Sequence, residues 1–457
     1  MYLKVVLSKV DPEGNNFAWT RRIGHALLKS SVIEIGGTRI DKQCGTWLDV
    51  WYELARQGDH ERGYNIMIGD VPKLTEYDSQ VKKEYVLYIP LQFWFCRFIG
   101  LSVPMIALQY HDVFLHVEFD KISNLIISDG KFDNNKATIK EASILSNYIF
   151  LDTDERRRFA ISGHEYLIEQ VQFNGVEPVL NEETKYTLDF NHPTKELIWL
   201  CRNGNFSSGK KFMYYTHKDK WSVKEAAKKI IRESISISFN PSNEVGGTWI
   251  PVPGHCVQQV NNWSIYNKND EYVYVNPTSL VNITDKINAD IVISKEGIIE
   301  CYNIKTSLGL EELSMSVEQM VDTRYNALDP KVNIFSNYGL YIDGSCNPIN
   351  KALLQFNSIN RFDRREGIYF NYVQAEQHHE NTPKDGINCY SFALHPDELQ
   401  PSGSANMSRI ESSQLTIWFK STKKSNYFTL ENKLYIFARS YNILRIYAGL
   451  SGLAYML

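Results

Sequence analysis

Three histidine-containing stretches carry residue types that could bind a metal ion or support hydrolysis. The first is HDVFLHVEF, which contains His111, His116 and Glu118. Side chains alternate along a strand, so His111 and His116 would lie on opposite faces, and only His116 can share a face with Glu118. Neither spacing matches a metal-binding strand motif. We therefore interpret these residues as polar positions on a solvent-facing strand.

The other two stretches are also incomplete as sites. His164-Glu165 begins like the zinc motif HExxH, but Ile168 stands where the second histidine must be. A zinc site of this kind needs that imidazole one helical turn further on. His378 and His379 are followed by Glu380, and we interpret this group as an exposed loop tip. We predict no metal site at either place.

Motifs for nucleophilic, phosphate or redox chemistry are absent from the sequence. It contains no GxSxG, no GxxxxGK[ST] and no GxGxxG after a strand. Its cysteines never form a CxxC pair, which argues against a zinc ribbon or a disulfide framework and indicates free thiols in a reducing compartment. The seven are Cys44, Cys96, Cys201, Cys256, Cys301, Cys346 and Cys389. We predict a protein that is not an enzyme, with no catalytic residues, metal or cofactor.

The densest run of charges is DERRRF. It comprises Asp154, Glu155, Arg156, Arg157 and Arg158. One interpretation is a solvated turn. The other is an ion-pair network between subunits or domains, because arginine forks pair well with carboxylates at interfaces. The acidic neighbours offset the arginines and the net charge of the chain is −4, so we predict no direct contact with nucleic acid.

The stretch SFALHPDELQPSGSANMSRIE, residues 391–411, is dense in polar and turn-forming residues. Two prolines fix the backbone on the approach to a glycine turn, and its serines can satisfy backbone groups that no strand reaches. We predict a rigid strand-to-strand connection that is also an assembly contact. Arg409 would form an ion pair with Asp397, Glu398 or a neighbouring subunit.

Most of the chain has the period of strands. Clear alternation in YLKVVLSKV and DVFLHVEFD, many short apolar runs and frequent turn signals predict an all-β sandwich or barrel. The content of 43% hydrophobic and 22% charged residues is typical of a soluble globular protein. Helical patterns are confined to GTWLDVWYELARQ, SVKEAAKKIIRES and LGLEELSMSVEQMV. We expect NILRIYAGLSGLAYML to form a final buried strand with a kink at its glycines.

Neither a signal peptide nor a membrane span is recognisable. The start MYLKVVLSKV is too broken for the apolar region of a signal peptide, and no uncharged apolar run reaches roughly 18 residues. A polar segment with two prolines predicts a linker at about 174–190. The predicted organisation is an N-terminal β-domain at 1–173 and a larger one at 191–457.

Several long motifs resemble one known family. RIGHALLKSSVIEIGGTRIDKQCGTWLDVWYEL, YIPLQFWFCRFIGLSVPMIALQYHDVFLHVEF and NYIFLDTDERRRFAISGHEYLIEQVQ are similar to the major capsid proteins of nucleocytoplasmic large DNA viruses. INCYSFALHPDELQPSGSANMSRIE and ARSYNILRIYAGLSGLAY resemble the last motif blocks of the same family. The likeness runs in order from about Trp19 to the end of the chain.

The resemblance implies a double jelly roll, two antiparallel eight-stranded sandwiches with short helices in loops. It implies a homotrimer with a pseudo-hexagonal outline that tiles an icosahedral capsid shell assembled in the host cytoplasm. Neighbouring capsomers, minor capsid and penton proteins would be its partners, near the internal viral membrane. We expect long outward tower loops at about 203–244 and 254–279. Possible glycosylation sequons lie at Asn205, Asn262, Asn282 and Asn406.

One departure from the family concerns the start of the chain. Family members usually carry a further segment, an N-terminal arm and the first strand of the first sandwich, before the part that corresponds to MYLKVVLSKV. We expect an alternative start, a partial chain, or a neighbour that supplies this edge, because an uncovered edge strand favours aggregation.

An alternative function is a carbohydrate-binding or cupin-like jelly roll that acts alone. Aromatic side chains can stack on sugars, and Trp249, Trp263 and Tyr266 would be the candidates. Metal analysis and a glycan array would distinguish this alternative from a capsid protein.

Overall fold

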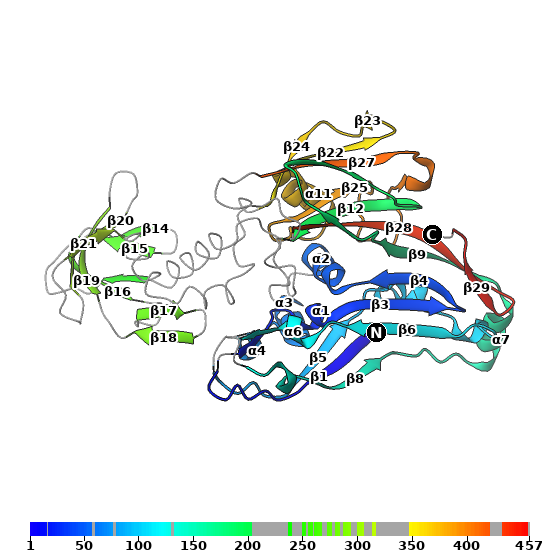
Figure 1. Ribbon diagram of the computed structural model, residues 1–457, viewed down its shortest axis with the longest axis horizontal. Coiled ribbons are helices and arrows are strands. Elements are labelled where there is room, and N and C mark those ends of the chain that lie inside the picture. Colours follow the sequence, from blue (N-terminus) through cyan, green and yellow to red (C-terminus); the bar gives the residue numbers. More distant parts are fainter. Residues whose placement is uncertain are drawn as a thin grey trace. The chain divides into compact units, whose positions relative to one another are not determined.

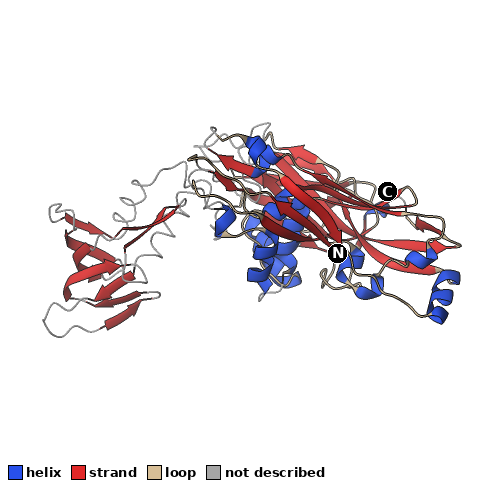
Figure 2. Cartoon of the chain, turned by 90° about the horizontal axis from the view of Figure 1, so that it is seen from below, coloured by secondary structure: helices blue, strands red, loops and turns tan. Residues whose placement is uncertain are grey.

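The computed structural model describes residues 1–202, apart from 16, 57–59, 76–78 and 129–131, and residues 347–455, apart from 421–431. Between 203 and 346 it describes the backbone of strands only. The chain forms two compact units, one of residues 1–75, 79–219 and 342–457, the other of 76–78 and 220–341. Strands run through the larger unit and its helices are short (Figure 2). The predicted all-β class is confirmed.

The first sandwich of the larger unit is built from three small antiparallel sheets. In one, β1 (Tyr2–Leu7) lies between β5 (Tyr85–Pro90) and β8 (Ile139–Leu145). In another, β3 (Leu28–Ile35) lies between β4 (Thr38–Gln43) and β6 (Val113–Phe119). The third pairs β2 (Phe17–Trp19) with β7 (Ile126–Ser128). The alternation that predicted strands at the start of the chain and at residues 112–120 is confirmed.

The first strand of the chain does not lie at an edge of its sheet. β1 is paired on both sides, and its residues Leu3, Val5, Val6 and Leu7 are buried. Within the described residues, β8 pairs with β1 alone and none of its residues is buried. Among the residues that the structure describes, the edges of this sheet are β5 and β8, and β8 is the more exposed of the two.

The second sandwich has a wide sheet centred on β28 (Lys433–Tyr447). Its neighbours are β12 (Pro193–Arg202) on one side, and β9 (His164–Gln172) and β10 (Val176–Pro178) on the other. β12 also pairs with β25 (Ile387–Ser391) and β26 (Ala405–Asn406). The facing sheet contains β11 (Glu183–Thr187), β27 (Ser413–Phe419), β22 (Ile349–Phe356), β23 (Ile359–Asn360) and β24 (Arg365–Glu366).

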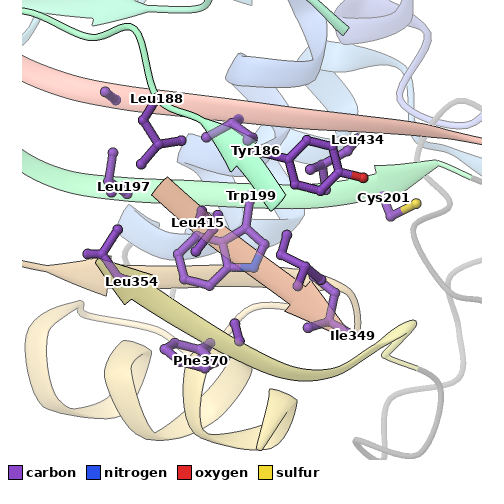
Figure 3. Packing of buried hydrophobic residues seen from close by; sticks show 14 of the residues in the cluster. Tyr186, Leu188, Leu197, Trp199, Cys201, Ile349, Leu354, Phe370, Leu415 and Leu434 are labelled. Atoms are coloured by element: carbon purple, nitrogen blue, oxygen red, sulfur yellow. The ribbon is translucent and has the colours of Figure 1, made fainter. Parts of the chain in front are cut away.

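The core of the second sandwich explains the continuous apolar run of β12. Leu197, Trp199 and Cys201 point into a cluster that includes Leu354 and Leu415 of the facing sheet (Figure 3). The β12 residues that point to the opposite face of this sheet are buried too, because that face is covered by α2 (Gly45–Ala55) and the first sandwich (Figure 1). A strand buried on both faces loses the apolar–polar alternation of a half-exposed strand.

The range predicted as a linker forms strands. β10 and β11 both lie within 174–190 and are hydrogen-bonded to β28 and β27. β9, which precedes that range, is paired with β28 along its whole length. The predicted position of the linker therefore needs correction. The sequence does not reveal these strands, because a polar strand of three to five residues is too short to show a hydrophobic period. The division into two β-domains stays a prediction.

The end of the chain is a hairpin rather than a kinked strand. After β28 the chain turns through Ala448 (φ 50°) and Gly449 (φ 81°) and returns as β29 (Leu450–Leu453). Two successive positive φ values are those of a tight type I′ hairpin turn. A Cβ on Gly449 would lie 2.6 Å from the ring of Tyr110, so this position requires glycine.

The helices connect the strands. Of the three predicted, the one at residues 45–57 is confirmed as α2. The one at 222–234 lies outside the described residues, and the one at 308–321 is wrong where β21 forms a strand. The described part of the chain also contains the helices α1 Ile23–Leu27, α3 Glu61–Ile68, α4 Pro72–Thr75, α5 Trp94–Arg97, α6 Ile122–Leu125, α7 Thr153–Ile161 and α11 Gln374–His378. It has 3-10 turns at η2 Ile99–Leu101, η3 Met105–Ala107, η4 Asn134–Lys136 and η7 Met407–Arg409, and a π-helical segment at η6 Tyr369–Val373. No helix in the described part of the chain is long and apolar enough to span a membrane.

The smaller unit is also built from strands. Its sheet has the order β13-β16-β19-β20-β21, and two hairpins pair β14 with β15 and β17 with β18. Much of the tower loop expected at 254–279 is therefore strand, whereas most of the one expected at 203–244 lies outside the described residues. The strands are β13 Ser236–Phe239, β14 Trp249–Val252, β15 His255–Gln258, β16 Val260–Tyr266, β17 Tyr272–Asn276, β18 Ser279–Ile283, β19 Ile287–Ile293, β20 Ile299–Lys305 and β21 Leu313–Ser316.

Candidate functional site

The most unusual chemistry of the larger unit is a set of buried charges between its two sandwiches. They form two groups. The first ion cluster consists of Arg22, Asp49, Glu53, Asp70 and Lys384. The second ion cluster consists of Arg97, Glu169, Lys195, Glu196, His379, Asp397 and Arg439.

Arg439 is the centre of the second ion cluster. One terminal nitrogen of its guanidinium lies 2.7 Å from Glu196 Oε1 and 3.2 Å from Asp397 Oδ1. The other lies 3.2 Å from Glu169 Oε2 and donates to the carbonyl oxygen of Pro396. The planar fork of arginine can serve several acceptors at once, which lysine cannot do with the same geometry. One side chain therefore joins β28 to β9, β12 and the connection after β25.

Three more cations complete this cluster. Lys195 Nζ and Arg97 Nη2 each lie 2.5 Å from a different oxygen of Glu169. The imidazole of His379 lies between two carboxylates, with 3.0 Å from Nε2 to Glu196 and 3.0 Å from Nδ1 to Asp397. Each carboxylate therefore has at least two cationic partners, as charges removed from water require.

Local strand geometry places these groups together. The register of β12 against β28 shifts between Thr194 and Glu196, so that Glu196 lies directly opposite Arg439. The shift indicates a β-bulge at Lys195, which lets two consecutive side chains enter one cluster where a regular strand would send them to opposite faces.

The second ion cluster reaches across to the first sandwich through α2 and α5. The guanidinium of Arg439 lies 4.3 Å from the ring centroid of Trp51 on α2, and that of Arg97 lies 4.9 Å from the same ring. Cations over an indole face are attracted by its quadrupole, more strongly where water is excluded. On the same side, Phe437 packs against Trp47 at 5.5 Å between ring centroids.

The charges of this cluster shift one another's protonation. Burial opposes the charged form of Glu169, but Arg439, Arg97 and Lys195 outweigh burial and lower the pKa of Glu169 to about 2. The same balance, with Arg439 and His379 as the main cations, lowers the pKa of Glu196 to about 2. Although burial opposes its charge, Glu196 and Asp397 raise the pKa of His379 well above its usual value. Glu169, Glu196 and His379 are therefore charged at neutral pH, whereas burial and Arg439 lower the pKa of Lys195 to about 8.

The depressed carboxylate pKa values predict an acid-sensitive stability. Glu169 and Glu196 bind protons more weakly in the folded than in the unfolded chain, so they stabilise the fold above pH ~4.5 and lose that contribution as pH falls towards 2. We expect the melting temperature to fall steeply over this window, and a Glu196→Gln variant to start lower and fall less. Scanning fluorimetry from pH 7 to 2.5 measures this. A melting temperature that stays constant down to pH 3 would contradict it.

The first ion cluster joins the sandwiches a second time. Arg22 Nη1 contacts Asp49 and lies 2.6 Å from Glu53, both on α2. Lys384, on the loop between α11 and β25 of the second sandwich, reaches the same two carboxylates at 3.2 and 3.7 Å. The backbone N–H of Asn381 on that loop donates to the carbonyl of Leu54. The two clusters together fix how α2 lies against the second sandwich.

The predicted contact residues have different positions. Asp397 is in the second ion cluster, with Arg439 and His379 rather than Arg409 as its partners. Glu398 is exposed, and its backbone oxygen accepts from Lys195. Arg409 is exposed at the end of η7, and Asp154 to Arg158 are all exposed on α7. The intrachain pair of Arg409 with Asp397 is therefore wrong, because two buried cations already occupy that carboxylate.

The sequence interpretation missed the centre of the site and misplaced one histidine. His379 is buried in the second ion cluster rather than exposed at the predicted loop tip. Arg439 and Glu196 were overlooked, although each left a signal in the sequence. Arg439 interrupts the apolar run LYIFARSYNIL, and Lys195-Glu196 open the apolar strand PTKELIWL. A lone charge inside a strand buried on both faces must have a buried partner.

Metal and ligand sites find little support among the described residues. No group of three or more potential metal ligands occurs there. His111 hydrogen-bonds to Ser451, and His116 lies 3.2 Å from Glu34 on an exposed face. A cavity of about 280 Å³ between β4 and β9 is lined by Asp41, but that carboxylate already accepts hydrogen bonds from Val171, Gln43 and Lys42.

The remaining candidates from the sequence are the glycosylation sequons and the aromatic residues that could stack on sugars. Asn406 is exposed, and its side-chain oxygen accepts from the backbone of Ser408. Asn262 lies in β16 and Asn282 in β18, while Asn205 lies outside the described residues. Trp249, Trp263 and Tyr266 lie on β14 and β16, where the described structure is limited to the backbone.

Comparison with known proteins gives matches along the whole chain. The family model of the large eukaryotic DNA virus major capsid protein matches residues 155–452, and that of the major capsid protein N-terminus matches residues 1–152. Capsid protein 1 of Acanthamoeba polyphaga mimivirus is 35% identical, over 100% of this chain and 88% of that relative. The major capsid protein of Phaeocystis pouchetii virus is 32% identical, over 99% and 86%.

Solved structures give the same result. The crystal structure of PBCV-1 VP54, fitted into a reconstruction of the virophage Sputnik, has a TM-score of 0.64 at 27% identity and covers 100% of this chain and 90% of its own. The Faustovirus major capsid protein has a TM-score of 0.55 at 12% identity over 97% and 77%, which is a likeness of fold alone.

Proposed function

Because this chain belongs to the major capsid protein family of large eukaryotic DNA viruses, we propose that three copies form a pseudo-hexagonal capsomer that tiles an icosahedral shell. The chain is a structural component of the virion capsid with a double jelly-roll fold, and the family is not enzymatic. The trimer, its outline and its tiling are the proposed part.

The observation that carries the proposal is the pair of ion clusters between the sandwiches. A hexagonal outline from three chains needs each chain to supply two corners at a fixed angle. The second ion cluster connects β9, β12 and β28 to Trp51 of α2, and the first connects α2 to the loop at Lys384. Buried charge pairs of this kind tolerate little displacement, because separating them leaves charges without partners in a low-dielectric interior. Each chain would thus supply two corners as one rigid body.

Contacts between chains are proposed at two levels. Interfaces within a trimer should bury more than about 2,000 Å², as obligate interfaces do, and those between trimers should be smaller and more polar. Glu398 and Arg409 remain candidate assembly contacts because both are exposed. Minor capsid and penton proteins, the vicinity of the internal membrane and assembly in the host cytoplasm belong to the same proposal.

Light scattering of the purified chain tests the proposed trimer. The expected mass is three times 52.8 kDa at micromolar concentration, and it should persist on dilution because obligate interfaces dissociate slowly. A monodisperse peak at the mass of one chain would refute the trimer and leave the double jelly-roll fold untouched.

A further inference from the structure

Helix α7 lies beside η3, and its Phe159 contacts the ring of His164 at 5.2 Å between centroids, but it buries little surface within its own chain. It spans Thr153–Ile161, and none of its nine residues is buried. Isolated helices shorter than about 12–15 residues are marginal in water, and helices in proteins are stabilised mainly by burying one face. Asp152 caps the helix by accepting from the backbone N–H of Glu155 at 3.0 Å, but a cap adds only about 1 kcal/mol. These contacts leave every residue of the helix at least partly exposed, so the helix has little of the packing that normally stabilises one.

Large apolar side chains flank this helix and are left in solvent. Phe150 is 93% exposed just before it, and Ile161 is 83% exposed at its last position. Tyr148 and Ile149 are exposed beside Phe150, and Tyr447 is exposed at the end of β28. Single exposed apolar residues are ordinary, but a group of this size around an unpacked helix indicates a surface that another protein covers.

The order of charges on α7 identifies the partner that fits. The acidic residues Asp152, Asp154 and Glu155 come first, and Arg156 to Arg158 follow. Among the described residues, the ion pair on this helix joins Arg157 to Asp154 at 3.8 Å, with both side chains at least three-quarters exposed. An exposed pair of this kind contributes little, so most of this charge is available to a partner. A helix that is acidic in its first half and basic in its second is complementary to an antiparallel copy of itself.

We propose that α7 and the adjacent residues 148–150 form a two-fold contact with the same segment of a second copy. The acidic half of each helix faces the arginines of the other, and Phe150 and Ile161 cover the ends of the contact. Arginine and aromatic residues dominate the energy of protein interfaces, which suits this composition.

The symmetry of this contact assigns it to one level of assembly. An isologous contact requires a two-fold axis, whereas chains within a trimer are related by a three-fold axis. The α7 contact therefore joins chains of different trimers. This assignment rests on the proposed trimer, but the two-fold contact itself does not.

Complementary charge variants test the contact. In Asp154→Lys/Glu155→Lys every charged residue of the helix is basic, and in Arg157→Glu/Arg158→Glu every charged residue except Arg156 is acidic. Sedimentation velocity over a range of concentrations measures association of the purified protein beyond the trimer. We expect each variant alone to associate at least tenfold more weakly than the unaltered protein, and an equimolar mixture of the two to regain most of the lost affinity.

Rescue in the mixture separates a contact from a folding defect, because two damaged helices would not repair one another. The matched control exchanges the exposed pair Lys351 and Glu366, which lies on β22 and β24 of the second sandwich and should leave association unchanged. Variants that associate as well as the unaltered protein, or a mixture that stays as weak as its components, would overturn the contact. If light scattering shows single chains rather than trimers, the mixture of the two variants still tests the α7 contact, because the variants would then associate as a heterodimer.

Discussion

Replacing Arg439 by alanine should lower the free energy of unfolding by about 3–5 kcal/mol, the usual cost of breaking a buried ion pair on one side. The substitution leaves Glu196 and Asp397 dependent on His379, and Glu169 on Lys195 and Arg97. It also removes one of the two guanidinium groups that lie over the ring of Trp51. Urea unfolding followed by tryptophan fluorescence measures the change.

Two variants make this result specific. Arg439→Lys keeps the charge, but a lysine cannot reach the acceptors on three elements. Its free energy of unfolding should therefore lie between that of the alanine variant and that of the unaltered protein. Arg157→Ala removes an arginine whose side chain is 75% exposed and should change stability by less than about 0.5 kcal/mol. An alanine variant at 439 as stable as the one at 157 would mean that the cluster does not hold the sandwiches together.

Replacing Trp199 by alanine should cost a similar amount, about 3–5 kcal/mol, through a cavity in the second sandwich. The indole is 1% exposed and packs against Phe370 at 5.2 Å between ring centroids. The matched control is Trp418→Ala on β27, where the indole is half-buried and stacks under the guanidinium of Arg364 at 4.0 Å. That variant should lose about 1 kcal/mol, as expected for an exposed cation–π contact.

The same urea titration compares these two tryptophan variants. Trp199→Phe should recover part of the loss, because the ring refills much of the cavity. Equal losses at 199 and 418 would contradict the placement of the core between β12 and its facing sheet.

The elements that sequence predicts well are those with one exposed face. β6 alternates between half-buried and exposed residues because one side of its sheet packs inward and the other does not. Where both faces are buried, as in β12 and β28, the period disappears and only the apolar run remains. Short polar strands such as β10 and β11 are too short to show a hydrophobic period, so their sequence resembles that of a linker.

The ion clusters could not be predicted as a whole because their members are far apart in the sequence. Arg439 contacts Glu169 and Glu196, which precede it by 270 and 243 residues. The stretch at 391–411 was expected to be a rigid connection, and its role is more specific. Asp397 and the carbonyl of Pro396 hold Arg439, so that connection completes the cluster rather than forming an exposed ion pair.

The exposed run of charges on α7 is visible in the sequence, but the sequence alone does not decide between a solvated turn and an interface. A solvated turn and an interface both tolerate DERRRF. The structure adds that this run is a helix with no buried residue beside exposed Phe150 and Ile161. Those apolar neighbours, which a purely solvated turn does not need, are what favour an interface.

Averaged electron micrographs of the light-scattering peak test the central claim most directly. If two rigidly joined jelly rolls from each of three chains form a capsomer, particles seen along their symmetry axis will have a six-cornered outline with three-fold symmetry. Particles with a single pair of sandwiches, or with two-fold symmetry and no three-fold axis, would contradict the account.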